Sequence, residues 1–157
     1  MAARSISQWF ADYGESHRNP VNKRLHFVCV PAIFFSIVGL LWAIPMPDAL
    51  LDLSPFFNIG TLSLLIVIGF YARLSLSITV GMLAFAIACL LVLWGLESAG
   101  VIIWLLSLIV FVVGWIGQFI GHHIEGKKPS FFEDLQFLMI GPAWIMGFLY
   151  RRWGIAY

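Results

Sequence analysis

Four histidines are the residues of this chain whose type and placement could do chemistry. His17 and His26 bound the polar decapeptide HRNPVNKRLH, and His122 and His123 stand together before EGKKP. Each pair lies at one end of a long apolar run. Neutral imidazole is a ligand of zinc and of non-heme iron, and a site that keeps a coordination position open permits catalysis. The pattern therefore predicts a metal site at a membrane surface, with all four histidines as candidate ligands.

The polar decapeptide has the pattern of a helix start. Asn19 can cap a helix whose first residue is Pro20, because proline has no backbone N–H to leave unpaired there. Such a helix places Asn22 and His26 four residues apart, one above the other on the same face. His17 would precede the cap and could fold back toward that face.

The second histidine pair ends an apolar helix. Gln118, His122 and Glu125 are spaced so that they share one helical face. Adjacent helical residues point about 100° apart, so His122 and His123 can bind one ion together only where the helix unwinds. Polar neighbours are expected to orient the imidazoles through hydrogen bonds. The candidates for this role are Asn19, Asn22, Gln118, Glu125 and Glu133.

Histidines at the ends of membrane segments can also bind lipid headgroups, and the gap between His17 and His26 is not a specific motif by itself. Two further classes of function therefore stay open. One is a non-catalytic membrane protein that assembles or organises lipid and keeps its histidines for structure. The other is a transporter of metal ions or protons, although the middle of the apolar runs holds almost no ionisable residue.

The composition places the chain in a membrane. It has 157 residues, of which 61% are hydrophobic and 11% charged, and its mean hydropathy is +0.95. Soluble domains are about half apolar and about one-quarter charged. We therefore expect a single membrane domain over residues 1–157. The net charge of +1 indicates no nucleic-acid partner, and Cys29 and Cys89, both inside apolar runs, are expected to stay free.

The apolar runs predict an all-α integral membrane bundle with four to five membrane segments and an N-terminal interfacial helix over residues 5–16. Arg73 is expected in a loop, and the short turn from Glu97 to Gly100 predicts an antiparallel hairpin of the third and fourth segments. The four clearest segments cover residues 27–44, 59–72, 74–96 and 100–121.

The last two segments carry small residues and helix-start signals. Gly114, Gly117 and Gly121 recur at a spacing that allows close helix approach. Ser130 and Glu133 match a capping box. Residues 135–150 contain Gly141 and Pro142, so this part is expected either to cross with a kink or to re-enter on its own side.

Basic residues suggest the orientation. With four crossings, the bases before the first segment, Arg73, and the lysines after the fourth segment share one side, which the positive-inside rule makes cytoplasmic. Both histidine pairs fall on that side. We expect an integral protein of a bacterial inner membrane, or of the endoplasmic reticulum in a eukaryote, with the metal site facing the cytoplasm.

These residues resemble a family of small membrane proteins whose yeast member is a 2-hydroxy fatty acid dioxygenase. The resemblance covers nearly the whole chain and is most specific in the two histidine segments. The family pattern departs at His123 and in the spacing of Glu125. The matching positions are His17, Arg18, Asn19, Asn22, Leu25, His26, Gly121 and His122.

The resemblance implies an Fe(II)-dependent dioxygenase that uses O2 to cleave a 2-hydroxy fatty acid between C1 and C2. The product would be a fatty acid one carbon shorter. Lys23, Arg24 or Lys127 could attract the substrate carboxylate, and the acyl chain would enter from membrane lipid between the helices. The oligomeric state stays open.

Overall fold

The regular secondary structure of the residues that the structure describes is entirely helical. A computed structural model describes residues 4–126 and 131–157, with side chains for 4–126 and 137–157. The prediction of an all-α membrane bundle is confirmed. The helices are α1 (Ile6–Glu15), α2 (Pro20–Trp42), α3 (Asp48–Leu51), α4 (Ile59–Ala72), α5 (Leu76–Ser98), α6 (Ile103–Glu125) and α7 (Phe131–Trp153).

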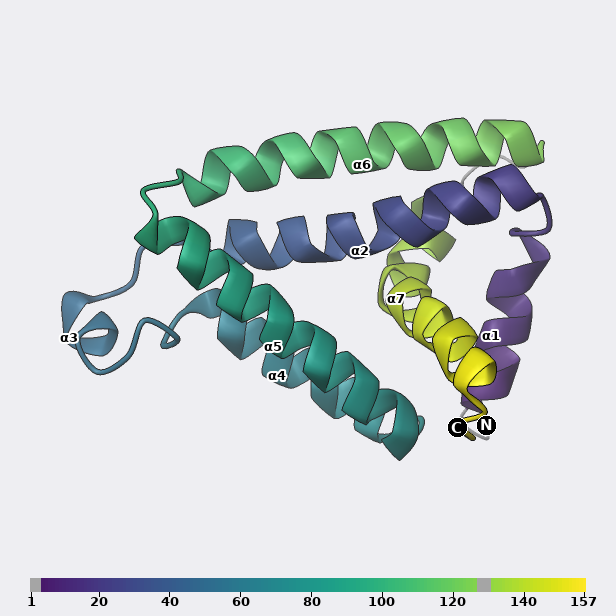
Figure 1. Cartoon of the computed structure of the whole chain (residues 1–157), viewed down its shortest axis with the longest axis horizontal. Coiled ribbons are helices and arrows are strands. Elements are labelled where there is room, and N and C mark those ends of the chain that lie inside the picture. The colour runs from purple at the N-terminus through teal and green to yellow at the C-terminus, as the bar shows by residue number, and fades with distance from the viewer. Residues whose placement is uncertain (1–3, 127–130) are drawn as a thin grey trace.

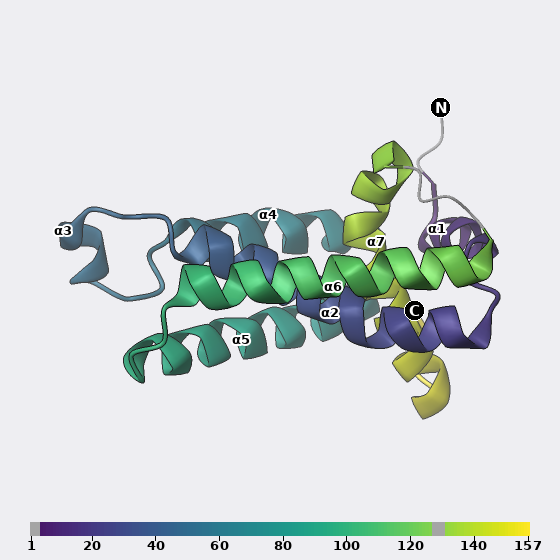
Figure 2. The ribbon, with the colours of Figure 1, turned by 90° about the horizontal axis from the view of Figure 1, so that it is seen from above.

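Helices α2 and α6 form the central pair. They run antiparallel and side by side along almost their whole length, so the start of α2 lies beside the end of α6 (Figures 1 and 2). Glycines make this approach possible. A Cβ on Gly114 would lie 2.7 Å from Ile33 Cγ1, and one on Gly117 would lie 2.5 Å from Cys29 Sγ. The predicted close packing at these glycines is confirmed.

Helices α4 and α5 pack on each other and diverge from the central pair (Figure 1). We predicted that the third and fourth segments, here α5 and α6, pack on each other as an antiparallel hairpin, and this prediction is wrong. The chain does turn at Ala99 and Gly100, but α6 leaves α5 and packs on α2 instead. The physical reason is that the glycine face of α6 fits α2. Arg73 follows α4 at its C-terminal cap, as predicted.

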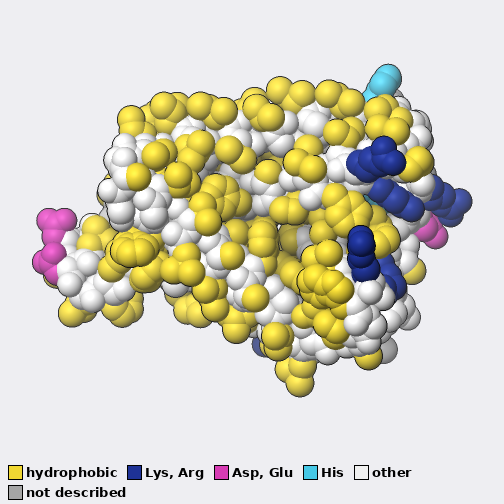
Figure 3. Space-filling model, viewed as in Figure 1, with side chains coloured by type: hydrophobic (Ala, Val, Ile, Leu, Met, Phe, Trp, Pro, Cys, Tyr) yellow, Lys and Arg dark blue, Asp and Glu magenta, His cyan; other side chains and the backbone are white. Residues whose placement is uncertain are grey.

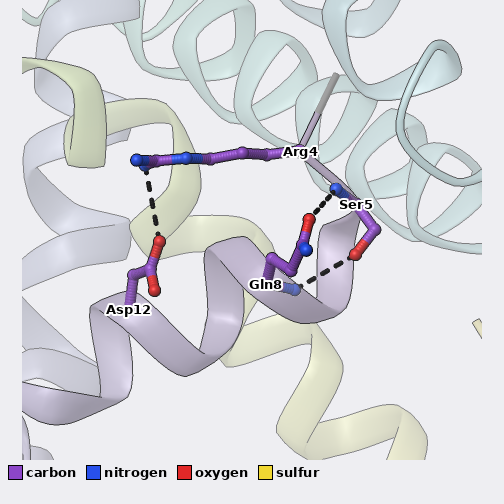
Figure 4. A network of polar contacts seen from close by, with 4 residues as sticks. All are labelled: Arg4, Ser5, Gln8 and Asp12. Atoms are coloured by element: carbon purple, nitrogen blue, oxygen red, sulfur yellow. Dashed lines mark hydrogen bonds and ion pairs between the residues drawn. The ribbon is translucent and has the colours of Figure 1, made fainter. Parts of the chain in front are cut away.

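Helix α1 begins at a capping box. The Ser5 hydroxyl accepts a hydrogen bond from the Gln8 N–H, the Gln8 side chain accepts one from the Ser5 N–H, and Arg4 pairs with Asp12 at 3.4 Å (Figure 4). The opposite face buries Ile6, Phe10 and Tyr13 in a cluster shared with α7. The predicted N-terminal helix therefore forms, and α7 covers its apolar face.

Helix α7 is one unbroken helix that contains Pro142. Whether this helix crosses the membrane or re-enters on its own side stays a prediction. Two tyrosines fasten it to the α4–α5 pair, because the Tyr71 hydroxyl donates to the Met139 carbonyl and the Tyr150 hydroxyl donates to the Ser77 carbonyl at 2.7 Å. Pro129, Ser130 and the side chain of Glu133 lie outside the described residues.

Three of the described helices, α2, α5 and α6, are long and apolar enough to cross a membrane by length and composition, and α4 is a shorter apolar helix. Apolar side chains cover most of the visible surface (Figure 3). Such a surface suits lipid contact. The number of true crossings stays a prediction.

Candidate metal centre

Three histidines meet where the start of α2 lies beside the end of α6. One nitrogen from each of His17, His26 and His122 can be chosen so that all three atoms lie within 4.8 Å of one another. The side chains are only 4%, 1% and 7% exposed. The His17 and His26 ring centroids are 4.1 Å apart, and those of His26 and His122 are 5.1 Å apart. Residues far apart in the sequence thus form one buried imidazole cluster.

His17 is held by the end of α1. Its Nδ1 lies 2.6 Å from the Tyr13 carbonyl oxygen, and its ring stacks on the Tyr13 ring at 4.1 Å with the planes 9° apart. A carbonyl oxygen can only accept a hydrogen bond, so Nδ1 carries the proton. The lone pair is then on Nε2. That atom is buried and has no hydrogen-bond partner among the described residues.

His26 has the same arrangement one helix later. Asn19 caps α2 by accepting a hydrogen bond from the Val21 N–H at 2.8 Å, and Pro20 occupies the first turn. The Nδ1 of His26 then lies 3.0 Å from the Asn22 carbonyl oxygen. The proton again sits on Nδ1, which leaves Nε2 as the nitrogen with a lone pair. A hydrogen bond from Nδ1 to a backbone carbonyl oxygen fixes both the tautomer and the ring orientation of a metal-binding histidine.

Glu125 holds the His17 segment against α6. Its carboxylate accepts hydrogen bonds from the Arg18 N–H at 2.8 Å, from the Asn19 N–H at 2.9 Å and from Asn22 Nδ2 at 3.0 Å. Glu125 lies one turn beyond His122 on the same helical face. It therefore supports the cluster by fixing the loop between α1 and α2.

The structure does not bring His123 to the cluster. Its side chain is exposed, because α6 stays helical through Glu125 and consecutive helical residues point about 100° apart. Gly126 ends α6 in the left-handed region with φ 73°. The helix does not unwind in the way that would let His122 and His123 share an ion. His123 is therefore not in position to be a ligand of the cluster.

The remaining residues predicted to orient the imidazoles divide into three groups. Gln118 is buried and lines the same cavity as His26. Asn22 orients His26 through its backbone carbonyl, and Asn19 acts as a helix cap. The side chain of Glu133 lies outside the described residues.

Burial keeps His17 neutral. The pKa of His17 is lowered to about 4, mainly because burial removes hydration from the charged form. His122 and Lys23 act in the same direction, whereas the hydrogen bond to Tyr13 and the charge of Glu125 oppose it. A neutral imidazole is the form that binds a metal ion. At neutral pH no proton has to leave His17 before it can act as a ligand.

A small cavity of about 40 Å³ adjoins the imidazoles. Besides the three histidines, its walls include Tyr13, Trp115 and Gln118. Neither Tyr13 nor Trp115 was among the site residues predicted from the sequence. A signal for Trp115 was present, because it stands three residues before Gln118 and seven before His122, on the same face of α6.

Lys23 and Arg24, which were predicted to attract a carboxylate, are not among the described residues that line this cavity. Arg24 is exposed and Lys23 is half-buried. Lys23 acts on the site at a distance, since its charge lowers the pKa of His17. Lys127 lies outside the described residues.

The cluster fits a divalent metal ion. Two Nε2 lone pairs are pre-oriented by backbone hydrogen bonds, and a buried, unpartnered acceptor such as His17 Nε2 otherwise costs about 1–3 kcal/mol. Three protein nitrogens would leave coordination positions for other ligands, as in catalytic zinc and non-heme iron sites. The donor set alone does not choose between these metals.

Comparison with known proteins places this arrangement in a family. The family model described as Mpo1-like, 2-hydroxy-palmitic acid dioxygenase, matches residues 3–153. The 2-hydroxy-palmitic acid dioxygenase MPO1 of Saccharomyces cerevisiae is 33% identical over 132 residues, which cover 83% of this chain and 71% of the yeast protein. No solved structure matches the chain. The chain belongs to the Mpo1-like family, and its three buried histidines, two of them in the decapeptide, lie within the matched region.

Proposed function

We propose that this protein is an iron-dependent dioxygenase of 2-hydroxy fatty acids in a membrane. Membership of the Mpo1-like family and the name of the yeast relative support the substrate class. The observation that carries the proposal is the cluster of His17, His26 and His122, whose ligand atoms lie within 4.8 Å of one another. A structural role alone would not require three buried imidazoles to bring their ring nitrogens this close together.

His17, His26 and His122 would hold the ion. Bound Fe(II) would supply the one-electron chemistry that spin-paired organic substrates need to react with O2. The protein contributes neutral ligands, fixed in orientation by the Tyr13 and Asn22 carbonyls. The buried position excludes bulk water, and the apolar surroundings suit O2 and an acyl chain.

The proposed reaction cleaves the bond between C1 and C2. One 2-hydroxy fatty acid and one O2 would give the fatty acid one carbon shorter, one CO2 and one water. The four electrons lost by C1 and C2 reduce O2, so no further reductant is needed. Lys23 and Arg24 would attract the substrate anion to this end of the protein rather than hold it, because neither lines the cavity.

We place the site at the cytoplasmic face of a bacterial inner membrane, or of the endoplasmic reticulum in a eukaryotic cell. Lys and Arg side chains gather mainly at the end where α1 and α7 lie, with an acidic group beside them, and further acidic side chains lie at the opposite end beside α3 (Figure 3). The acidic residues of α3 and its cap, Asp48 and Asp52, are exposed. The positive-inside rule then puts the histidine end in the cytoplasm.

The test uses adjacent histidines as a matched pair. Protein purified anaerobically in detergent is assayed for bound iron, for O2 uptake and for conversion of 2-hydroxypalmitate to the acid with one carbon fewer. We expect His122→Ala to lose both bound iron and activity. His123→Ala, the exposed neighbour on the same helix, should keep both.

Two other results would contradict the proposed function. Full activity of carefully iron-free protein would exclude iron dependence. Wild-type protein that binds iron but leaves 2-hydroxypalmitate unchanged would contradict the dioxygenase reaction and favour a non-catalytic or transport role.

A further inference from the structure

Two residues that line the histidine cavity carry a buried N–H donor without an acceptor among the described residues. Trp115 Nε1 and Gln118 Nε2 are both buried and have no hydrogen-bond partner among the described residues. Both residues line the cavity beside the histidines, and the Gln118 side chain is only 6% exposed. A buried donor left unpaired costs about 1–3 kcal/mol. Two of them next to a candidate metal site therefore indicate a ligand that accepts hydrogen bonds.

The charge of the site indicates what kind of ligand this is. The described lining contains neither a carboxylate nor a Lys or Arg side chain. A divalent ion held by three neutral imidazoles would keep its full positive charge in buried surroundings, which is unfavourable unless an anion accompanies it. An anionic group that also accepts hydrogen bonds satisfies the ion and both N–H donors together.

The size of the cavity limits how much of that ligand enters. A volume of about 40 Å³ has room for about three water-sized groups. It can take a head group of a few atoms beside an ion, whereas a long acyl chain must lie outside it. Val30, Ile33 and Leu138 complete the wall with apolar side chains, which could contact the first carbons of such a chain.

We propose that Trp115 Nε1–H and Gln118 Nε2–H bind the carboxylate and 2-hydroxyl head group of the substrate next to the metal. The proposal rests on the proposed function and assigns head-group recognition to α6 in place of the basic residues predicted from the sequence. Trp115, Gln118 and His122 share one face of α6. One rigid helix thus presents a metal ligand and two hydrogen-bond donors at fixed separations.

The test measures binding without turnover. Protein loaded with Zn(II), which has no redox chemistry, is equilibrated in detergent with radiolabelled 2-hydroxypalmitate, and the dissociation constant is determined by equilibrium dialysis. Trp115→Phe keeps an aromatic ring and removes only the donor. Gln118→Met keeps length and removes the amide. Trp104→Phe is the matched control, because Trp104 lies on the same helix and is 54% exposed.

We expect Trp115→Phe and Gln118→Met each to weaken binding about tenfold to a hundredfold, as for hydrogen bonds to a charged group. The control variant should bind like wild type, and all variants should retain zinc. Binding of hexadecane-1,2-diol, which lacks the carboxylate, should change much less. That difference separates head-group recognition from a general loss of packing.

Three outcomes would overturn the assignment. Unchanged affinity in both variants would refute it while leaving the proposed function intact. Equal losses for the acid and for the diol would show a packing role. Zinc-loaded wild type that does not bind 2-hydroxypalmitate would refute both the head-group site and the proposed function.

Discussion

The carboxylate of Glu125 accepts a hydrogen bond from the backbone N–H of Asn19, with Oε2 2.9 Å from the nitrogen. The same carboxylate accepts from the Arg18 N–H and from Asn22 Nδ2. Because Glu125 lies one turn after His122 and Arg18 directly follows His17, this single side chain fixes the loop that carries one histidine to the helix that carries another. The geometry of the cluster therefore depends on a residue that is not itself a ligand.

Replacing Glu125 should loosen the metal site without removing a ligand. Glu125→Gln keeps the size of the side chain but turns an N–H toward backbone donors that need an acceptor. We expect metal affinity to fall about tenfold to a hundredfold, as for other groups that orient metal ligands. Competition with a chromophoric chelator measures this change.

Glu97→Gln provides the control for that experiment. Glu97 also joins two helices through a hydrogen bond, which it accepts from Trp42 Nε1 at 3.0 Å, but it lies at the other end of α2. This variant should lose some stability and keep its metal affinity. Equal loss of affinity in both variants would mean that general stability, and not the Glu125 clamp, sets the geometry of the site.

Gly121 should tolerate no side chain. It faces Asn22, and a Cβ there would overlap with Asn22 Oδ1. Gly121→Ala should destabilise the protein by about 1–3 kcal/mol, as overpacking does, and should also weaken metal binding, because Asn22 donates to Glu125. Unfolding in detergent followed by circular dichroism measures the first effect.

Gly69→Ala should have the opposite effect on stability from Gly121→Ala. Gly69 lies inside α4 with no atom within 4 Å of an added Cβ, so alanine should stabilise the helix by about 0.5–1 kcal/mol. If Gly121→Ala were as harmless as Gly69→Ala, close packing of α2 on α6 would not be what brings the histidines together.

Local signals in the sequence were sufficient to anticipate that the histidine segments meet. The Asn19 cap and Pro20 fix where α2 begins, and this start determines which face carries His26. The three glycines of α6 mark the face that packs closely on another helix. That helix, α2, is far from α6 in the sequence but lies beside it in the fold. The approach of His17, His26 and His122 follows from these two facts together with the antiparallel course of α2 and α6.

Other features depend on tertiary contacts that no local pattern records. The imidazoles are oriented by the carbonyls of Tyr13 and Asn22, and every residue has such a carbonyl, so residue types alone do not single them out. In the sequence, Trp115 resembles any lipid-facing tryptophan, and only the folded chain shows that it lines a cavity with residues of α2 and α7. The short turn after α5 suggested a hairpin, whereas the better fit of α6 to α2 decided the packing.

Tyr71 should contribute to stability by docking α4 on α7. It is completely buried, and its hydroxyl donates to the Met139 carbonyl. Tyr71→Phe removes the donor and keeps the ring, so we expect a loss of about 1 kcal/mol. Thermal unfolding in detergent measures it. An unchanged melting temperature would show that the carbonyl finds another donor.

The metal-free protein should lose stability as the pH falls from 6.5 toward 4. The pKa of His17 is about 4 in the folded state, because burial disfavours the charged imidazole, and returns to its ordinary value of 6.5 on unfolding. Between these values the unfolded state binds more protons, so the free energy of unfolding decreases with acid, by about 3 kcal/mol in total for this group. His17→Gln should make the dependence on pH shallower by at most about 1.4 kcal/mol per pH unit, the value for one proton. Urea unfolding of metal-free protein in detergent at pH 7, 6, 5 and 4 measures both slopes, and equal slopes would contradict a neutral, buried His17.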